Sequence, residues 1–390
     1  MTEIFGAGFA ADPWPVLARL RGEGGVHRVR TPDGPPAWLV TRYADVRAGL
    51  LDDRLTSRTR WAGAEDYVGF AVPAPLNSMV LAEPVDHARL RRMVTGELSP
   101  RRLAEWTRTA PALVDSLLRE LDSGTETDLV ERLAVPLPAA VIGELLGLGA
   151  AERESLLGWA NSTLLPSATP PRARDTLTTM LEIVTASTEQ ARAARADTVL
   201  GRLVAAHDDT GSPNSNELAG LLFYLLFVWY EVLVDLVAGS VLTLIGRPDQ
   251  RKILHDAAEK HSAVDELLRY LSPQVLAGPR FATTELTIGE HTILAGQTVL
   301  LCLASANHDP EFFDSPDDID LTRASHAQLG LGLGMHACLG NALVRTLTAA
   351  VLDHVFTRWP DTTLTVPERD IAWRSGFRHR GPQTLPVKLA

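Results

Sequence analysis

The sequence predicts a mainly helical protein with a minor β region, organised as one domain over residues 1–390 with a helix-rich lobe and a small β-rich N-terminal and central region. The first observation is an apolar run from Leu218 to Ile245. With its polar lead-in from Asn214 it would form a central helix about 48 Å long at roughly 1.5 Å per residue. The second is a series of amphipathic stretches at 101–122, 136–147, 152–164 and 174–195. The third is a set of short β-rich runs, Val26 to Arg30, Ala37 to Thr41 and Leu286 to Leu301.

Each of these elements is bounded by recognisable breaks. The long apolar run carries Glu231 and Asp235 in its middle, where a lipid-facing helix would be strongly penalised, so we expect a buried core helix. Helical stretches are separated by Pro and Gly clusters such as Ala168-Thr169-Pro170-Pro171. The β-rich run from Leu286 contains two turns, at Gly289-Glu290 and Ala295-Gly296.

Composition narrows the class of protein. The chain has 37 Lys and Arg against 48 Asp and Glu, a net charge of -11, which argues against nucleic acid or an anionic membrane as a partner. Two cysteines, Cys302 and Cys338, are too few for a disulfide framework and fit a reducing compartment. The first fifteen residues have no basic region followed by an apolar run. We therefore expect a cytoplasmic protein in which a cysteine is a ligand, a nucleophile or filler.

The segment from Leu331 to Gly340 predicts a thiolate ligand. It places Cys338 after closely spaced glycines, Gly332 and Gly334, and just before a helical pattern from Ala342 to Val355. A helix N-terminus lowers the pKa of a thiol and so favours the thiolate, the form that binds iron. Glycines let the backbone approach a flat macrocycle closely, so the loop has the chemistry of a haem-thiolate site.

The loop allows three other interpretations. Gly332-x-Gly334-x-x-Ala337 fits a loose dinucleotide-binding pattern, although the preceding residues 322–328 do not have the pattern of a strand. His336 and Cys338 could start a zinc site, but no second Cys/His pair has ligand spacing. A buried structural cysteine is the common alternative for an isolated residue.

The loop resembles the haem-binding motif of the cytochrome P-450 family, Phe-Gly-x-Gly-x-His-x-Cys-x-Gly, with Leu331 in place of the aromatic residue. The resemblance covers nearly the whole chain and indicates an atypical member of the bacterial soluble haem-thiolate type. It implies the family fold, with the long central helix over a haem b whose iron takes its axial thiolate from Cys338. Gly332 and Gly340 would then line the cofactor.

Two further groups of residues match the family by position. Glu266 and Arg269 resemble its Glu-x-x-Arg helix motif, and Arg323 matches the downstream arginine that completes a buried ion network. For the haem propionates, which need cationic donors, the resemblance implies His87, Arg91, Arg280 and His336. Without the resemblance, each of these would be read as an ordinary solvated charge. In the segment Ala306-Asn307-His308-Asp309-Pro310, His308 replaces the family's arginine.

The long helix departs from the family pattern of Ala/Gly-Gly-x-Asp/Glu-Thr, because this chain has Val228-Trp229-Tyr230-Glu231-Val232. On that alignment Glu231 keeps the acid, Trp229 replaces the glycine that opens a groove for dioxygen, and Val232 replaces the threonine. Valine neither donates nor accepts a proton. We name Trp229, Glu231 and Val232 as candidate catalytic positions, with core packing of Trp229 as the simpler alternative.

Three functions follow from these residues. One is the family's default, a monooxygenase that takes electrons from a ferredoxin and inserts oxygen into a small hydrophobic substrate. A second is a redox-neutral cyclisation, rearrangement or dehydration in a preorganising pocket. A third is a catalytically dead scaffold that binds a carrier protein. Retention of Cys338, Glu266, Arg269 and Arg323 argues against it. Val232 and Trp229 favour the redox-neutral function, with the conventional monooxygenase as the alternative. We expect a haem-thiolate enzyme of specialised metabolism, such as antibiotic biosynthesis, with impaired oxygen activation. Its substrate contacts would come from loops near 60–80 and 155–185.

Overall fold

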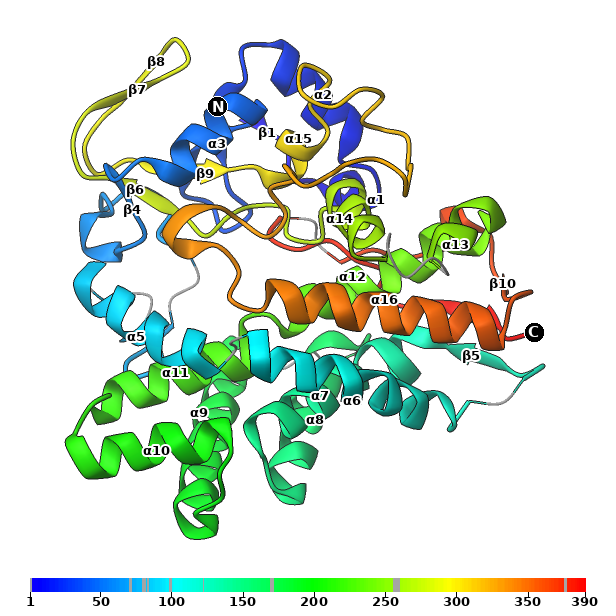
Figure 1. The fold of residues 1–390 in the computed structure, drawn as a ribbon. Helices are drawn as coiled ribbons and strands as arrows, with labels where there is room; N and C mark the ends of the chain where they lie inside the picture. Colours follow the sequence, from blue (N-terminus) through cyan, green and yellow to red (C-terminus); the bar gives the residue numbers. More distant parts are fainter. Residues whose placement is uncertain are drawn as a thin grey trace. The chain divides into compact units, whose positions relative to one another are not determined.

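The computed structural model describes residues 2–69, 72–78, 82, 84–97, 100–121, 123–168, 172–254, 260–374 and 377–390. The backbone divides into two compact units, which Figure 1 shows in the colours of the sequence. Unit 1 contains Met1–Ala71, Arg247–Asn341 and Ala372–Pro382, and unit 2 contains Val72–Gly246, Ala342–Ile371 and Gln383–Ala390. The prediction of a mainly helical chain with a minor β region is confirmed.

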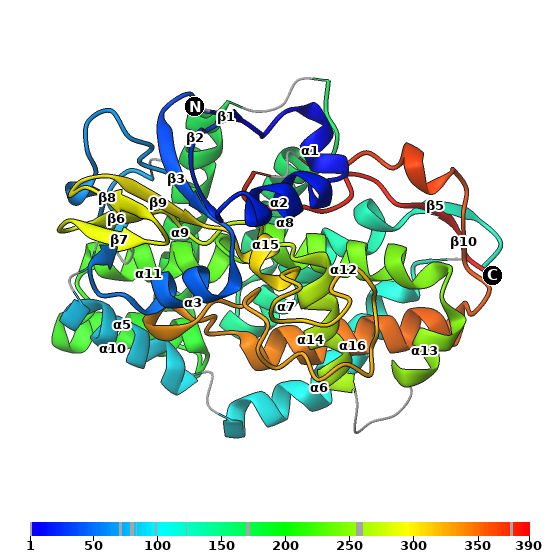
Figure 2. The ribbon, with the colours of Figure 1, turned by 90° about the horizontal axis from the view of Figure 1, so that it is seen from above.

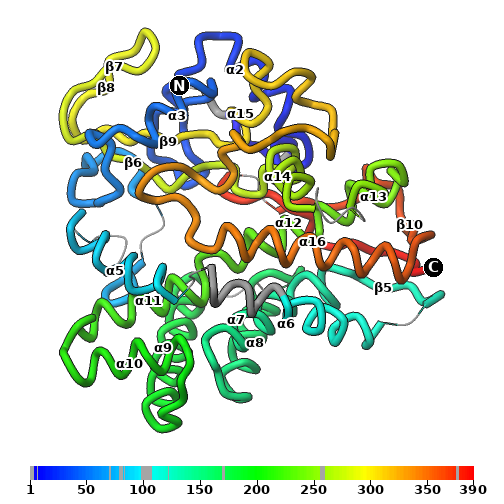
Figure 3. The backbone as a smooth tube through the Cα atoms, in the orientation of Figure 1, coloured from blue at the N-terminus to red at the C-terminus, as the bar shows by residue number. Residues whose placement is uncertain are grey.

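Unit 1 is built on a six-stranded sheet with the order β1-β2-β3-β9-β6-β4. At its centre, β3 (Pro36–Val40) is antiparallel to β2 (Val26–Arg30) and parallel to β9 (Thr298–Leu301), and Figure 2 shows these strands side by side. The other strands are β1 (Thr2–Glu3), β6 (Arg280–Ala282) and β4 (Leu55–Thr56). A hairpin of β7 (Leu286–Ile288) and β8 (His291–Ile293) extends away from this sheet in Figure 3. The predicted run from Leu286 therefore divides into three strands at its two predicted turns.

Side chains alternate between the two faces of the sheet along each strand of unit 1, and each face is covered by a helix. One face packs against α2 (Trp14–Gly22), and the other against α3 (Tyr43–Leu51). The first face is formed by Ala37, Leu39 and Leu300 with Leu17 and Leu20 of α2. The second is formed by Val40, Val299 and Leu301 with Val46 and Leu50 of α3. The remaining helices of unit 1 are α1 (Ala7–Ala11), α13 (Pro248–Leu254), α14 (Lys260–Leu271) and α15 (Leu303–Asn307), with short 3-10 turns η1 (Thr59–Trp61) and η3 (Gly334–His336).

A column of stacked side chains joins distant segments of unit 1. Arg380 lies 3.7 Å from the ring centroid of Trp373 and 5.3 Å from that of Trp14. Trp14 in turn stacks on His308 at 3.9 Å. Arg380 also donates hydrogen bonds to the carbonyl oxygens of Ala10, at 2.9 Å, and Ala11, at 2.8 Å. One buried arginine therefore attaches the first helices to residues near the carboxyl end of the unit.

Unit 2 contains most of the helices. They are α5 (Pro84–Glu97), α6 (Pro100–Leu118), α7 (Pro136–Leu146), α8 (Ala150–Leu164), α9 (Ala173–Ala194), α10 (Val199–Thr210), α11 (Ser215–Phe227), α12 (Tyr230–Ile245) and α16 (Asn341–Arg358), with a π-helical turn η2 (Val130–Ala134) and a 3-10 turn η4 (Glu368–Asp370). Its small sheet has the order β10 (Thr363–Leu364), β11 (Pro386–Lys388) and β5 (Glu126–Asp128). The four amphipathic stretches become α6 to α9 with ends within four residues of those predicted. Of the predicted break at 168–171, residues 169–171 lie outside the described part of the chain.

The long apolar helix differs from its prediction in one respect. It is interrupted at Val228 and Trp229, so that α11 ends at Phe227 and α12 begins at Tyr230. Trp229 has φ -103° and ψ -5°, which departs from regular helical geometry. Among the described residues, this helical stretch, Ser215–Ile245, is the one long and apolar enough to cross a membrane, and 67% of its apolar window is buried in the structure. That degree of burial is typical of the predicted core helix.

Replacing Arg380 with Met tests the stacked column. The variant keeps the length of the side chain but leaves the buried Ala10 carbonyl, and the more exposed Ala11 carbonyl, without this donor, so we expect the free energy of unfolding to fall by about 1–3 kcal/mol. Urea unfolding measures the change. The matched control is Arg19→Met, which removes an exposed ion pair with Glu23 and should change stability by at most about 1 kcal/mol. Equal losses in both variants would contradict the role given to Arg380.

Candidate functional site

The cysteine loop is shaped by two glycines in left-handed conformations. Gly332 has φ +68° and Gly334 has φ +74°, values that side-chain-bearing residues rarely adopt. At Gly334 a Cβ atom would also come within 3.0 Å of Leu51. The loop closes where the backbone N–H of Cys338 donates to the carbonyl of Leu331 at 2.8 Å. Cys338 is thereby held at the end of a compact turn, three residues before α16 begins.

The structure separates the two cysteines by their surroundings. Cys302 is 1% exposed, and burial raises the pKa of its thiol to about 12, so it stays protonated. Cys338 is only partly buried in its glycine-rich loop. Because only the thiolate binds a metal, Cys338 is the one suited to be a ligand.

A buried carboxylate, Glu266 on α14, organises the chain that leads to this loop. Its side chain is fully buried, and it accepts two hydrogen bonds from Arg269, from Nε at 2.7 Å and from Nη2 at 2.8 Å. Arg323 donates to the same carboxylate through Nε at 3.1 Å. The backbone N–H of Asp320 and the hydroxyl of Ser325 also donate to it. The three residues named from the sequence are therefore in direct contact.

Arg269 extends this network to the backbone. It donates to the carbonyl oxygens of Asn307 at 2.9 Å, Pro316 at 2.6 Å and Asp318 at 3.1 Å. Its side chain is fully buried, so its charge is balanced by Glu266 and its donors by these carbonyls. Helix α14 thus holds the segment of irregular backbone that follows α15.

Asn307 and Gln328 hold the start of the cysteine loop, and the sequence did not single them out as site residues. The amide of Asn307 accepts a hydrogen bond from the backbone N–H of Leu329 at 2.8 Å and donates to Ser272 at 3.0 Å. Gln328 accepts from the backbone N–H of Gly330 at 2.6 Å. Asn307 does lie in the segment that matched the family pattern, which was the available signal. Gln328 had none, because one of its partners is a backbone group and the other, Asp265, lies far away in the sequence.

The residues predicted to contact the propionates are divided between the two units. In unit 2, His87 and Arg91 lie four residues apart on α5, and burial, followed by the nearby Arg91 charge, lowers the pKa of His87. In unit 1, Arg280 begins β6, is 5% exposed and donates to the carbonyl of Gly278 at 2.8 Å. His336 is exposed in the cysteine loop. Their contact with a cofactor stays a prediction.

The residues that depart from the family pattern lie at or next to the interruption between α11 and α12. The indole N–H of Trp229 donates to the carbonyl oxygen of Leu225, one turn earlier, at 2.8 Å. Val228 is 38% exposed, and Trp229, Glu231 and Val232 are partly buried, in a helix whose later residues are almost all buried. Trp229 is therefore not a fully enclosed core residue of unit 2.

The structure bears on two alternative interpretations of the cysteine loop. Residues 322–328 form turns and no strand, so the dinucleotide interpretation is wrong. No group of three or more His, Cys, Asp or Glu side chains suited to a metal ion occurs among the described residues, which gives a zinc site no support.

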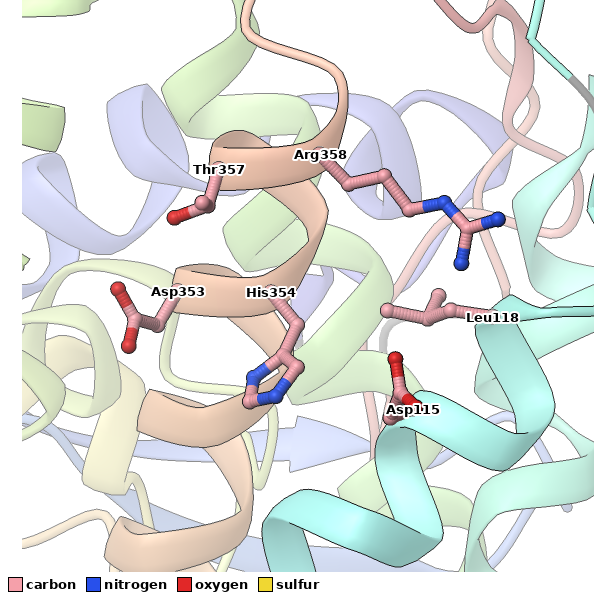
Figure 4. Close-up of a pocket in the computed structure, with 6 residues that line it drawn as sticks. All are labelled: Asp115, Leu118, Asp353, His354, Thr357 and Arg358. Carbon is pink, nitrogen blue, oxygen red and sulfur yellow. The ribbon is translucent and has the colours of Figure 1, made fainter.

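A separate hollow lies between α6 and α16 in unit 2 (Figure 4). Its lining is Asp115, Leu118, Asp353, His354, Thr357 and Arg358. Asp115 is paired with Arg119 at 3.1 Å, and Nδ1 of His354 lies 2.8 Å from the carbonyl of Ala350. None of the predicted site residues lines it, so this polar hollow is not the candidate site.

Comparisons with known proteins place the whole chain in one family. The family model described as Cytochrome P450 matches residues 261–360, which include Glu266, Arg323 and Cys338. The chain is 34% identical to vitamin D(3) 25-hydroxylase of Pseudonocardia autotrophica, over 99% of this chain and 96% of that protein. It is also 34% identical to the cytochrome P450 monooxygenase PikC of Streptomyces venezuelae, over 98% of this chain and 92% of that protein. The protein belongs to the cytochrome P450 family.

The comparison with solved structures agrees. The tirandamycin C-bound P450 monooxygenase TamI is 32% identical, with a TM-score of 0.90 over 100% of both chains. The Bacillus subtilis bacillaene polyketide synthase P450 PksS is 29% identical, with a TM-score of 0.89 over 100% of both chains. The predicted P450 fold is confirmed. These relatives make the chain a P450 enzyme of the kind found in bacterial natural-product metabolism.

Replacing Glu266 with Gln tests the buried network. The substitution keeps the shape of the side chain but removes its charge, which leaves Arg269 without a buried counter-ion. We expect a loss of about 3–5 kcal/mol in stability and little haem-loaded soluble protein. Denaturant unfolding and the haem content of purified protein measure both effects. Arg323→Ala should lose less, because Arg323 is more exposed.

The matched control is Glu285→Gln, at an exposed position in the same unit. If Glu266→Gln retained the haem content and stability of that control, the network would not support the site as described.

Proposed function

We propose that the protein is a haem-thiolate monooxygenase that oxidises a small hydrophobic natural-product intermediate with dioxygen and electrons from a ferredoxin-type donor. The observation that carries this proposal is a partly exposed Cys338 in a haem-binding motif that is complete except for Leu331, on a chain that covers 96% and 92% of two of its relatives. Among those relatives are proteins described as 6-deoxyerythronolide B hydroxylase and nocardicin C N-oxygenase. We also propose a cytoplasmic location, because the one long apolar helical stretch among the described residues is largely buried.

The described residues fit a haem b. Cys338 would supply the thiolate that the iron needs. Gly332 and Gly340 would let the backbone approach the flat macrocycle. The cations for the two propionates would come from His87, Arg91, Arg280 and His336. At Gly340 a Cβ atom would meet nothing within 4 Å, so the loop leaves open space there. When bound, the haem supplies the activation of dioxygen.

Residues at and just after the helix interruption bear on how protons would reach the site. Val232 has no hydroxyl, and the N–H of Trp229 is donated to the Leu225 carbonyl. Glu231 is then the titratable side chain of the motif, and we propose that it passes protons through water to the site. Because general acid-base assistance is worth about 10²–10⁴-fold, the missing hydroxyl should reduce the fraction of reductant that ends in product.

A redox-neutral cyclisation or rearrangement is the second candidate. Val232 favours it, because a reaction that uses no dioxygen does not need the threonine hydroxyl. The relatives named as hydroxylases and oxygenases favour the oxidative reaction, and for that reason we place it first.

Turnover with and without dioxygen separates the two candidates. A panel of macrolide, polyketide and aromatic natural products is incubated with the enzyme, a surrogate ferredoxin and its reductase. We expect product only when oxygen and reductant are both present, one atom of labelled dioxygen in the product, and low coupling. Product that forms without either would establish the redox-neutral candidate.

Val232→Thr tests the missing hydroxyl. The variant should raise the ratio of product to reductant consumed by about tenfold or more, because general acid-base assistance can be worth about 10²–10⁴-fold. The matched control is Val228→Thr, which adds the same hydroxyl to the neighbouring exposed position. An equal rise in both variants would contradict a specific role for position 232.

The ligand assignment is tested by replacing each cysteine in turn. Cys338→Ala should abolish the thiolate-type Soret shift that carbon monoxide produces on reduction, whereas Cys302→Ala should retain it. Retention of that shift in Cys338→Ala would refute the assignment.

A further inference from the structure

The start of the cysteine loop, within unit 1, is held through the side chain of Gln328. Its amide oxygen accepts the backbone N–H of Gly330 at 2.6 Å. The next residue, Leu331, accepts the backbone N–H of Cys338 through its carbonyl oxygen at 2.8 Å. A Gln328 amide with a fixed orientation therefore fixes the backbone group that in turn holds Cys338.

Gly330 lies in a space too narrow for a side chain. A Cβ atom there would come within 3.0 Å of the Gln328 amide oxygen, 3.2 Å of the Leu268 carbonyl oxygen and 3.6 Å of the Asn307 amide nitrogen. The backbone is thus confined on the side of α14 and α15. The remaining freedom of the Gly330 N–H depends on the Gln328 amide that receives it.

The orientation of this amide is set by Asp265 of α14. The NH₂ group of Gln328 donates to the Asp265 carboxylate at 3.2 Å, and the two residues are 7% and 3% exposed. The amide cannot exchange its two ends, because its oxygen would then face a carboxylate and its NH₂ group a backbone N–H. A hydrogen bond to an ionised acceptor is also stronger than a neutral one and polarises the amide toward its oxygen.

The second oxygen of the Asp265 carboxylate lies on the side of an exposed residue. Oδ2 is 3.7 Å from Nδ1 of His326, whose side chain is 74% exposed. Exposed ion pairs contribute little, because solvent screens them. The contact through which Asp265 can act on the cysteine loop is therefore the one with Gln328.

We propose that Asp265 is a positioning residue for the thiolate, acting through Gln328 on the loop that holds Cys338. The proposal rests on the proposed function, because it takes Cys338 to be the ligand of the haem iron. Asp265 keeps the oxygen of the Gln328 amide on the Gly330 N–H. Its role differs from that of its neighbour Glu266, which fixes the backbone before the loop.

An exchange of the two groups without a change of shape tests this proposal. Gln328→Glu alone sets two carboxylates against each other, and Asp265→Asn alone replaces a charged acceptor with a neutral one. The double variant reverses the bond, because the amide at position 265 donates to the carboxylate at 328, whose other oxygen can accept from Gly330. The matched control is His326→Ala, which alters the other side of the same Asp265 carboxylate.

Two measurements on the haem-loaded protein report the result. The first is the ratio of thiolate-ligated to other haem, taken per haem from the Soret band of reduced protein under carbon monoxide. It is read in mild urea at which wild type shows both forms and keeps its secondary structure. The second is hydrogen exchange of the peptide 329–338, which reports opening of the loop itself.

We expect Gln328→Glu to lower the ratio by about tenfold or more, and Asp265→Asn by about threefold or more. The double variant should return to within about threefold of wild type, and His326→Ala should match wild type. Loop exchange should be faster only in the two single variants. If Gln328→Glu yields no haem-loaded protein, its recovery in the double variant is the expected result.

Three outcomes would overturn the proposal. One is a double variant no better than Gln328→Glu, since the loss would then not come from this contact. Another is an unchanged ratio in both single variants. The third is a loss in His326→Ala equal to that in Asp265→Asn, because the effect would then not pass through Gln328.

Failure of the proposed function gives a different result. If Cys338 were not the ligand, wild type itself would show no thiolate-type Soret shift, and this inference would fall with the proposed function. A normal wild-type shift with unchanged variants would remove this inference alone. If the chemistry were redox-neutral, the ratios would be as expected and only the oxygen requirement would change.

Discussion

The buried charge of Glu266 is the constraint on which the cysteine loop depends. A carboxylate with no exposed surface is costly unless it is paired and fully hydrogen-bonded, and here Arg269, Arg323, Ser325 and a backbone N–H meet that need. Arg269 then satisfies three carbonyl groups of a segment that has no regular secondary structure. These hydrogen bonds fix the conformation of the irregular backbone that leads to Cys338. The main contribution of the network is to fix the position of this backbone segment, because a well-packed apolar replacement could give the same free energy of unfolding.

The helix interruption shows how one element can serve both stability and function. On its buried side, aromatic contacts and the Tyr230 hydroxyl hold the chain in place. On its other side, the Leu225 carbonyl receives the indole N–H of Trp229. On the alignment proposed from the sequence, Trp229 takes the place of the family's small groove residue and Val232 takes the place of its threonine. Proton delivery should lose from the missing hydroxyl at position 232.

Sequence periodicity predicted α6 to α9, the long apolar helix, α16 and the central strands, because burial of one face imposes a regular pattern on the residues. Short edge strands such as β4 and β10 were missed, since two residues carry no period. The interruption at Val228 and Trp229 was missed too, because neither residue breaks a helix by itself and the contacts of the flanking Phe227 and Tyr230 with Trp159 cannot be read from the sequence. At the site, spacing and resemblance identified Glu266, Arg269, Arg323 and Cys338. Gln328 and the Leu225 carbonyl could not be found that way, since their partners depend on the path of the folded backbone.

A crystal structure of the haem-loaded protein tests the central claim most directly, namely that Cys338, in the loop that the Glu266 network supports, holds the haem iron. We predict that the sulfur atom of Cys338 binds the iron and that Arg269 and Arg323 still donate to the Glu266 carboxylate. An iron held by another side chain, or a haem-loaded protein in which these contacts to Glu266 are broken, would contradict the account.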